Sequence, residues 1–397
     1  MRNNYTKIVE FSGKNFLDKN GVFYANLDYE TYGPVTAETV TGGVPCAWFS
    51  GFGLAEFLAY ENAGMTTGSY MAALCLEGTP EERKKVYNGL KWLYETGKEL
   101  EEGFIPKPYG GRFFPQTSTD QVLYVMYALD LYYPLADEAE KKEIRRMIVK
   151  MADFWMKRNY HFDYYHVKNM KWPPLRFPSF LMLAWKYSGE ERYRTEAYRI
   201  LDENIDWIPE HSKVFVRRGL SDFEKQHNIR IVNQAADAVS MDIMNLDLLI
   251  RCEPEGKYRE RFIKAMEVSV KEGFMTICDN GRYEALLFYD MNTGKMRLPR
   301  KYEHPDMDDW KTYTSSWSTM IVRAALIASQ YLPHKQKEIF EMSEFVLSKI
   351  GLENCHYAEK PANLCEHERY EYRLLSGDGI SNWLWGANLY RKFKKQK

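Results

Sequence analysis

The sequence has few of the features that place a protein in a membrane or stabilise it by disulfide bonds. Its 397 residues include only six Cys, none of them in a Cys-x-x-Cys pair, which argues against a disulfide-rich scaffold. No segment approaches the ~18 uncharged apolar residues that a membrane helix needs. Residues 1–16 also lack an apolar run of signal-peptide length. We therefore expect a reduced, cytoplasmic protein with no membrane partner.

An excess of one charge and the common nucleotide and hydrolase motifs are missing too. The 54 basic and 55 acidic side chains give a net charge of -1, so nothing favours binding to nucleic acid. The chain contains no GxGxxG after a strand, no GxxxxGK[ST], no HExxH and no GxSxG. These absences argue against nucleotide-dependent transfer, zinc proteolysis and serine hydrolysis, and we expect no cofactor.

What the sequence does contain is an alternation of two kinds of helical segment. One kind is nearly uncharged and therefore predicts a helix buried on all sides; its members are 48–62, 118–133, 177–188, 232–250, 313–332 and 379–390. The other kind is densely charged with an apolar stripe and predicts a surface helix; its members are 80–102, 136–159, 190–208, 256–273 and 335–350.

Buried and exposed helices that alternate about six times predict an all-α (α/α)6 toroid, an inner ring of helices wrapped by an outer ring. A stacked α-solenoid is the competing fold, but its repeats are shorter and more regular, at ~34–47 residues. No linker divides the chain, so we expect one domain over 1–397. The remaining stretches, including 1–45 and 209–231, are expected to be non-helical, with a small β-hairpin near 282–299 that turns at Asn292-Thr293-Gly294.

In such a toroid the inner helices are parallel, so the residues at their N-termini surround one mouth. Three of these junctions carry an aspartate, and we predict that Asp120, Asp237 and Asp378 are catalytic, because such clefts collect carboxylates of perturbed pKa. The alternative for each is an ordinary helix cap or turn.

The same junctions are rich in aromatic, amide and hydroxyl groups, as a sugar-binding cleft requires. Asp242 follows Asp237 by five residues, so the two cannot share one helix face. Because Asp242 is further from the N-terminus of the helix, we expect it to lie deeper, as a structural residue or at the bottom of a funnel. Arg112 is a candidate for an anionic group such as a uronate, or else forms a loop salt bridge. The full set of predicted substrate-binding residues is Trp48, Arg112, Gln121, Trp172, Asn233, Gln234, Asp242, His304, Trp317, Asn382 and Trp383.

The chain resembles the six-hairpin glycosidase superfamily, and within it the unsaturated glucuronyl and rhamnogalacturonyl hydrolases. The resemblance lies in length and layout, in Thr119-Asp120-Gln121, and in the run from Met241 to Leu246, where Asp242 is shifted by one residue against the family motif. It implies a glycoside hydrolase in which an Asp acts as general acid/base, hydrates a vinyl ether and needs no metal. The expected partner is a short oligosaccharide, with or without a uronate unit.

Several other functions remain open. A toroidal polysaccharide lyase would use a Tyr or His base, and because the chain contains 29 Tyr, a lyase is an alternative to a hydrolase. Sugar epimerases of this shape resemble the chain in size but carry histidines on inner helices, and none of the eight His falls in a predicted inner segment. A non-catalytic toroid that binds a glycan or a protein is the alternative outside enzymology.

Two short clusters suggest further chemistry. Asp306, Asp308 and Asp309 match the DxDD pattern of terpene cyclases, a motif with many false positives. A second cluster has the residue types of a zinc site but no known ligand spacing, so we expect no metal there; it consists of Cys355, His356, Cys365 and His367.

Overall fold

A computed structural model describes most of the chain. The described residues are 2–36, 39–41, 53–165, 167–210, 220–233, 236–284, 286–297, 314–355, 371–372 and 374–395.

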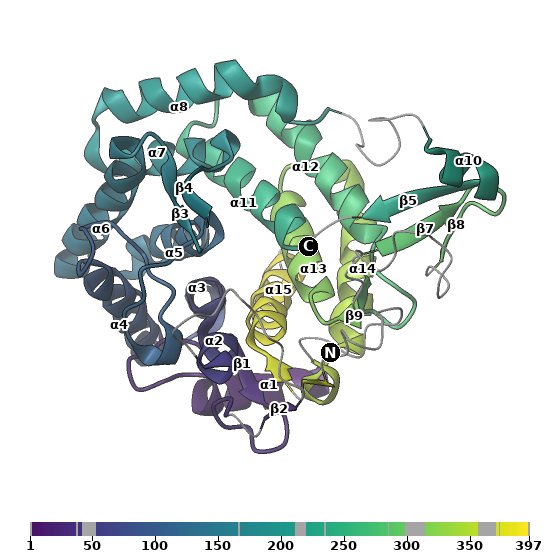
Figure 1. Cartoon of the computed structure of the whole chain (residues 1–397), viewed down its shortest axis with the longest axis horizontal. Helices are drawn as coiled ribbons and strands as arrows, with labels where there is room; N and C mark the ends of the chain where they lie inside the picture. The colour runs from purple at the N-terminus through teal and green to yellow at the C-terminus, as the bar shows by residue number, and fades with distance from the viewer. Residues whose placement is uncertain are drawn as a thin grey trace.

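Two concentric rings of helices dominate this part of the chain (Figure 1). The inner ring consists of α3 (Ala63–Glu77), α5 (Thr119–Tyr132), α7 (Pro178–Ser188), α11 (Ala236–Cys252), α13 (Ser318–Ala328) and α15 (Gly377–Lys395). The outer ring consists of α1 (Arg2–Asn15), α4 (Pro80–Gly97), α6 (Glu138–Lys157), α8 (Glu191–Asn204), α12 (Arg259–Phe274) and α14 (Gln336–Lys349). The last inner helix, α15, packs against the first, α3, and closes the ring. The predicted (α/α)6 toroid is confirmed.

The two rings differ in burial as their sequences predict. Residues 63–74 of α3 and 377–390 of α15 are buried without interruption, whereas α6 buries a stripe that includes Ile144, Met151 and Trp155 and leaves its charged face in solvent. One continuous hydrophobic core fills the space between the rings. No helix in the described ranges is long and apolar enough to cross a membrane.

Local sequence signals fix several helix ends. Pro80 opens α4, and Thr79 and Glu82 form a reciprocal capping box before it, with Glu82 N donating to Thr79 Oγ1 at 3.2 Å. At the other kind of end, Gly189 takes a left-handed conformation (φ 73°) and terminates α7.

The start of the chain differs from the prediction. Residues 1–45 were expected to be non-helical, but Arg2–Asn15 form α1, the sixth outer helix. The segment 48–62 was expected to be the first inner helix; that helix is α3, which begins at Ala63, and the shorter α2 (Leu54–Tyr60) precedes it. The uncharged residues 63–76 form most of α3 and are followed directly by α4. The first inner helix therefore lies about one helix later in the chain than the predicted segment 48–62.

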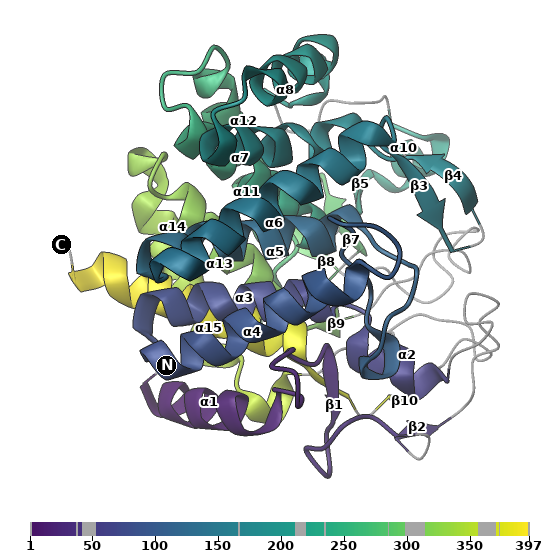
Figure 2. The ribbon, with the colours of Figure 1, turned by 90° about the vertical axis from the view of Figure 1, so that its left-hand side faces the viewer.

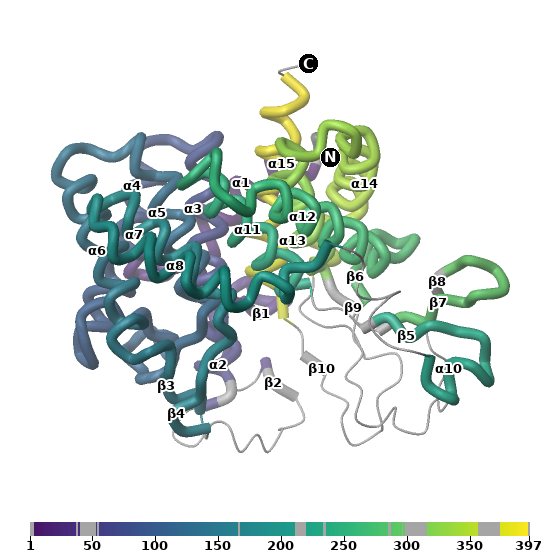
Figure 3. Tube along the Cα trace, turned by 90° about the horizontal axis from the view of Figure 1, so that it is seen from above, coloured from purple at the N-terminus to yellow at the C-terminus, as the bar shows by residue number. Residues whose placement is uncertain are grey.

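Short strands and loops gather at one end of the toroid, where the inner helices begin (Figure 3). The 3-10 turns are Tyr109–Gly111 (η2), Tyr133–Leu135 (η3), Pro174–Arg176 (η4), Ile205–Trp207 (η5), Pro333–Lys335 (η7) and Leu352–Asn354 (η8). The strands are β1 (Asn26–Asp28), β2 (Val40–Thr41), β3 (His161–Tyr164), β4 (Val167–Lys171), β5 (Ile229–Asn233), β6 (Tyr283–Glu284), β7 (Leu286–Asp290), β8 (Lys295–Arg297), β9 (Thr314–Ser315), β10 (Glu371–Tyr372) and β11 (Leu374–Ser376).

The strands pair antiparallel in small sheets, and the largest projects from the rim of the rings (Figure 1). The predicted hairpin is present as β7 and β8, in which Asp290 pairs with Lys295 across the expected turn. Strand β5 adds to β7 and makes a three-stranded sheet. Helix α10 (Asp222–His227) lies within 209–231, so the prediction that this stretch is non-helical is wrong there. In the side view these additions stand at the same end as α2 and the β3–β4 hairpin (Figure 2).

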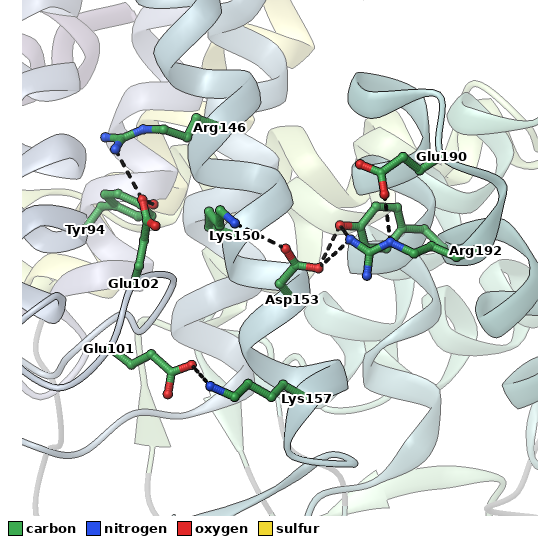
Figure 4. Close-up of polar contacts among 10 residues, drawn as sticks. Tyr94, Glu101, Glu102, Arg146, Lys150, Asp153, Lys157, Glu190 and Arg192 are labelled. Atoms are coloured by element: carbon green, nitrogen blue, oxygen red, sulfur yellow. Dashed lines mark hydrogen bonds and ion pairs between the residues drawn. The ribbon is translucent and has the colours of Figure 1, made fainter.

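Ion pairs between neighbouring elements hold the charged face of the outer ring (Figure 4). Asp153 on α6 accepts from Arg192 on α8 at 2.9 Å, and Arg192 also binds Glu190 at 2.7 Å. On the other side of α6, Lys157 pairs with Glu101 at 3.0 Å. Each exposed pair contributes little alone, so the bulk of the stability comes from the core between the rings.

Candidate active site at the mouth of the inner ring

Three aspartates at the starts of three inner helices lie within electrostatic range of one another at the mouth. Asp120, Asp237 and Asp378 each occupy the first turn of their helix, α5, α11 and α15 respectively. Burial raises the pKa of Asp237, and the negative charge of Asp120 raises it further. Burial and the charges of both Asp120 and Asp237 also raise the pKa of Asp378. The structure therefore brings together the three predicted carboxylates.

Asp378 is the most deeply buried of the three, with 1% of its surface exposed. Its Oδ2 accepts a hydrogen bond from Asn62 Nδ2 at 2.8 Å, and its Oδ1 has no partner among the described residues. Burial is the main reason why the pKa of this carboxyl rises to about 7, and the bond from Asn62 opposes the rise. A substantial fraction of Asp378 is therefore protonated at neutral pH.

The other two carboxylates are more accessible. Asp120 and Asp237 are half-buried, and Asp237 Oδ1 accepts from the backbone N–H of Ala238 at 2.9 Å. The guanidinium of Arg176 lowers the pKa of Asp237, opposing burial. One buried carboxyl with a pKa of about 7 thus lies near two carboxyl groups that are more exposed to solvent.

A second polar cluster lies on the side of α3 and η2. Glu61 forms an ion pair with the buried Lys107 and accepts hydrogen bonds from the hydroxyls of Tyr109 and Tyr165. Burial alone would lower the pKa of Lys107, but the charge of Glu61, followed by those of other groups including Asp120, raises it above the ordinary value. Lys107 is therefore a permanent cation at the edge of the carboxylate group.

The β3–β4 hairpin brings Tyr164 into the same environment. The pKa of Tyr164 is raised mainly by burial, and its hydroxyl feels the charges of Lys107, Glu61, Asp120 and Arg176. Tyr164 is half-buried, so a phenol hydroxyl is available beside the carboxylates.

Arg176, at the end of η4, connects the mouth with a neighbouring pocket. Its Nη1 donates to Thr119 Oγ1 at 2.9 Å and contacts Met241 Sδ at 3.3 Å. The pocket encloses about 960 Å³ of empty space, part of it open to solvent, and is mostly apolar. Its walls include Pro173, Pro174, Trp207, Ala238, Met241 and Asp242.

Among the predicted binding residues, two amides lie inside the scaffold. Gln121 is buried and binds the start of α3, where its Oε1 accepts from Gly64 N at 2.7 Å. Asn382 is buried one turn below Asp378 and donates to the backbone oxygen of Asp378 at 2.9 Å. Both amides position the site from within, in place of the predicted contact with a sugar.

The tryptophans also differ from the prediction. Trp383 is fully buried and donates its indole N–H to Leu347 O of α14 at 3.2 Å, so it packs between the rings and does not face the mouth. Trp172 is 6% exposed and packs edge-on against Trp155. Trp317 is half-buried just before α13, at the mouth end. Of these three, Trp317 alone keeps the placement that sugar stacking requires.

Three further residues that were predicted to bind substrate lie at the edge of the site. Arg112 has a side chain that is 60% exposed and pairs with Glu56 at 3.2 Å, which is the loop salt bridge that the sequence left open. Asp242 is exposed and lines the apolar pocket, so the expected position deep in the ring is wrong. Asn233 ends β5, where its backbone pairs with Leu286.

The remaining predictions fall outside the described residues. These are Trp48, Gln234 and His304 of the binding set, the Asp306/Asp308/Asp309 motif, and His356, Cys365 and His367 of the possible zinc cluster. Cys355 is described and is a buried thiol whose pKa burial raises to about 12. No group of three metal-binding side chains occurs in the part of the chain that the structure describes.

Sequence reasoning missed Glu61, Asn62, Lys107, Tyr164 and Arg176. Glu61 and Asn62 immediately precede α3, so recognising 63–76 as the first uncharged helix would have identified them as a junction. Lys107 lies on a loop and Tyr164 on the β3–β4 hairpin, each more than ten residues before the next inner helix. Their positions depend on how these segments fold back.

Comparison with family models and with curated protein sequences finds no match. Solved structures do match. A sugar epimerase from a ruminal bacterium superposes with a TM-score of 0.57 and 15% identity over 100% of this chain and 98% of that chain. An unsaturated glucuronyl hydrolase specific for heparin gives 0.55 and 11% over 99% and 96%. A D-mannose isomerase gives 0.53 and 11% over 99% and 97%.

These matches cover nearly the whole chain, and their low identities establish the fold alone. They confirm the (α/α)6 fold that the six-hairpin resemblance implied. The matched enzymes process carbohydrates, but they catalyse different reactions, so the reaction has to be argued from the site.

Proposed function

We propose that the protein is a glycoside hydrolase that acts on short oligosaccharides, including those with a uronate unit. The observation that carries the proposal is the meeting of three carboxyl groups at the mouth, one of which, Asp378, has a pKa of about 7. Acid/base hydrolysis of a glycoside requires one protonated and one ionised carboxyl group at the same pH.

In this mechanism Asp378 is the general acid and Asp120 or Asp237 the base. Asp378 donates its proton to the glycosidic oxygen as the bond from that oxygen to the anomeric carbon breaks. The base takes a proton from a water molecule, whose oxygen forms the new bond to the anomeric carbon. The raised pKa of Asp378 supports its assignment as the acid among the three predicted aspartates.

Groups around the carboxylates supply substrate recognition. Arg176 is a cation beside Asp237, which makes it a better candidate for a uronate carboxylate than the exposed Arg112. In this proposal Trp317, half-buried just before α13, stacks on a sugar ring. The pocket beyond Arg176 has room for the next unit of the substrate, with Pro173, Pro174 and Trp207 as apolar surfaces.

The proposal is tested by assaying the wild-type protein against 4-nitrophenyl glycosides and against unsaturated uronyl disaccharides. We expect Asp378→Asn and Asp120→Asn each to lower kcat by about 10²-fold or more. Asp153→Asn, on the outer face of α6, is the matched control and should retain full activity. Wild-type turnover in both site variants would remove the carboxylates from the mechanism.

Sugar epimerisation or isomerisation is the second candidate, because a sugar epimerase and a mannose isomerase share the fold. None of the six inner helices, all of which are described, carries a His, which disfavours the histidine chemistry of such enzymes. Incubation with cellobiose and with mannose, followed by NMR of the products, separates the candidates: an isomer of unchanged mass indicates epimerisation or isomerisation, whereas two smaller sugars indicate hydrolysis.

A further inference from the structure

A second polar layer lies one helical turn below the carboxylates. Tyr124 follows Asp120 by four residues on α5, Ser240 follows Asp237 by three on α11, and Asn382 follows Asp378 by four on α15. Residues three or four apart share a helix face, so this layer points into the ring beneath the carboxylates.

One side chain binds all three members of this layer. Arg323 of α13 donates from Nε to Asn382 Oδ1 at 2.9 Å and from Nη2 to the Tyr124 hydroxyl at 2.7 Å. Its Nη2 also donates to Ser240 Oγ, which in turn bonds to the Tyr124 hydroxyl at 2.7 Å. Four inner helices therefore meet at one guanidinium group.

Arg323 is an unusual residue to find at this depth. It is fully buried, its guanidinium lies over the ring of Trp385 at 4.2 Å, and it forms no ion pair with a described carboxylate. Its Nη1 lacks a hydrogen-bond partner in the same part of the structure. Burial lowers the pKa of Arg323. Since a buried charge without a counter-ion is costly, folding stability does not account for this residue.

We propose that Arg323 is a positioning residue of the active site, which holds the helices that carry Asp120, Asp237 and Asp378 in their mutual arrangement. The inference rests on the proposed function, and it extends that function to a group that does not touch the substrate. A planar guanidinium suits this task because its donors are fixed in direction.

The connection to the aspartates runs through one chain of hydrogen bonds and one electrostatic interaction. Because Arg323 donates to Asn382 Oδ1, the Asn382 amide must present Nδ2 to Asp378 O, where it bonds at 2.9 Å. Tyr124 is bonded to Arg323 and senses the acids: burial raises its pKa most, the charge of Arg323 lowers it, and the charges of Asp378 and Asp237 raise it. The titratable groups that act on or near Asp378 are Glu61, Asp120, Asp237, Tyr124 and Cys355.

The test compares Arg323→Met and Arg323→Lys with Asp247→Asn. Asp247 is a matched control because it lies on α11 two turns below Ser240, is equally buried, and accepts hydrogen bonds from Tyr127 and Tyr331 at 2.6 and 2.8 Å. We expect Arg323→Met to lower kcat by about 10²-fold, as misplacement by about 1 Å does, with KM within about threefold and no loss of melting temperature beyond that of Asp247→Asn. Arg323→Lys, with a single donor centre, should recover no more than about a tenth of the wild-type rate.

A second measurement is independent of turnover. In protein labelled with ¹³C at Asp carboxyl groups, the Asp378 signal is assigned by its loss in Asp378→Asn and followed through a pH titration. We expect its midpoint to move upward in Arg323→Met, because the cation beneath the carboxylates is removed, and to stay in place in Asp247→Asn. If Arg323→Met leaves both the Asp378 midpoint and kcat unchanged, the positioning role is wrong. It is also wrong if Asp247→Asn changes the midpoint and kcat as much as Arg323→Met does.

The two proposals fail separately. If wild-type protein hydrolyses no glycoside, the proposed function is wrong, and the titration still decides whether Arg323 positions the carboxyl group. If glycosides are hydrolysed and Arg323→Met behaves like wild type, only the positioning role is lost.

Discussion

At the residue scale, the environment of Asp378 sets two effects against each other. The first turn of a helix favours a negative charge, because the backbone N–H groups point toward it. Burial favours the neutral form and is the larger effect, since the pKa of Asp378 rises to about 7. The position was recognisable from the sequence as a lone charge at the start of an uncharged segment, but its protonation was not, because that depends on neighbours from α3, α5 and α11.

Replacing Asp378 by Asn should stabilise the protein at alkaline pH. The folded pKa lies above the ordinary value of 3.8, so stability contributed by this group is complete below about pH 4 and is lost as the pH rises through 7. Asparagine has no charge to bury and keeps an oxygen for Asn62. We expect a gain of about 1 to 4 kcal/mol at pH 8 that shrinks as the pH falls and disappears below about pH 4, measured by urea unfolding. A variant less stable than wild type at pH 8 would contradict the assignment.

Lys107 should be essential for the local structure of the site. Its side chain is 2% exposed and pairs with Glu61, and removing one partner of a buried pair costs about 3 to 5 kcal/mol. We expect Lys107→Met to lower the free energy of unfolding by about 3 kcal/mol and the double variant with Glu61→Gln to recover part of the loss. Lys157→Met, which removes an exposed pair with Glu101, should cost less than about 1 kcal/mol.

At the scale of elements, the direction in which a side chain leaves its helix decides its role. Trp383 follows Asp378 by five residues, and five residues rotate a helix by about 500°, so the two cannot point the same way. Asp378 faces the mouth and Trp383 faces α14. The sequence placed both at an inner-helix entrance, and only the packing showed which one faces the ring axis.

The contact between α3 and α5 depends on a glycine. A Cβ atom at Gly68 would lie 2.5 Å from the backbone oxygen of Tyr124, so alanine there must push the two helices apart. We expect Gly68→Ala to lower the melting temperature and to reduce kcat, because α5 carries Asp120. In Gly386→Ala, the new Cβ would meet only Arg323 atoms at 3.4 Å or more, and wild-type stability and activity are expected. A well-folded, fully active Gly68→Ala protein would show that this spacing is not critical.

At the scale of the whole molecule, the toroid is closed by contacts between the two ends of the chain. Tyr5 on α1 donates to Asn388 Oδ1 at 2.6 Å, and Asn388 Nδ2 donates to Ala73 O at 2.9 Å. One amide thus joins α1, α15 and α3. The N-terminal outer helix α1 was not expected from the sequence, because its composition is mixed and the helix that it packs against, α15, lies at the other end of the chain.

Breaking this junction should loosen the ring without altering the site chemistry. We expect Asn388→Ala to lower the free energy of unfolding by about 1 to 3 kcal/mol, because Tyr5 and Ala73 lose their hydrogen-bond partners. Chemical unfolding measures the loss. Asn204→Ala, which removes a bond to Ile200 O within α8, is the control and should have a smaller effect. An unchanged free energy in Asn388→Ala would show that closure does not rely on this residue.

The sequence by itself determined the two classes of helix and therefore the toroid, because an uncharged segment has to be buried on every side and a charged one cannot be. It also located Asp120, Asp237 and Asp378, since each is a rare charge at the start of a buried segment. Only the tertiary structure decided that Asn62, Lys107 and Tyr164 surround these carboxyl groups, and that Arg323 lies beneath them. The reason is physical: periodicity specifies how a helix is buried, whereas the partners of a side chain and its pKa depend on segments far away in the chain.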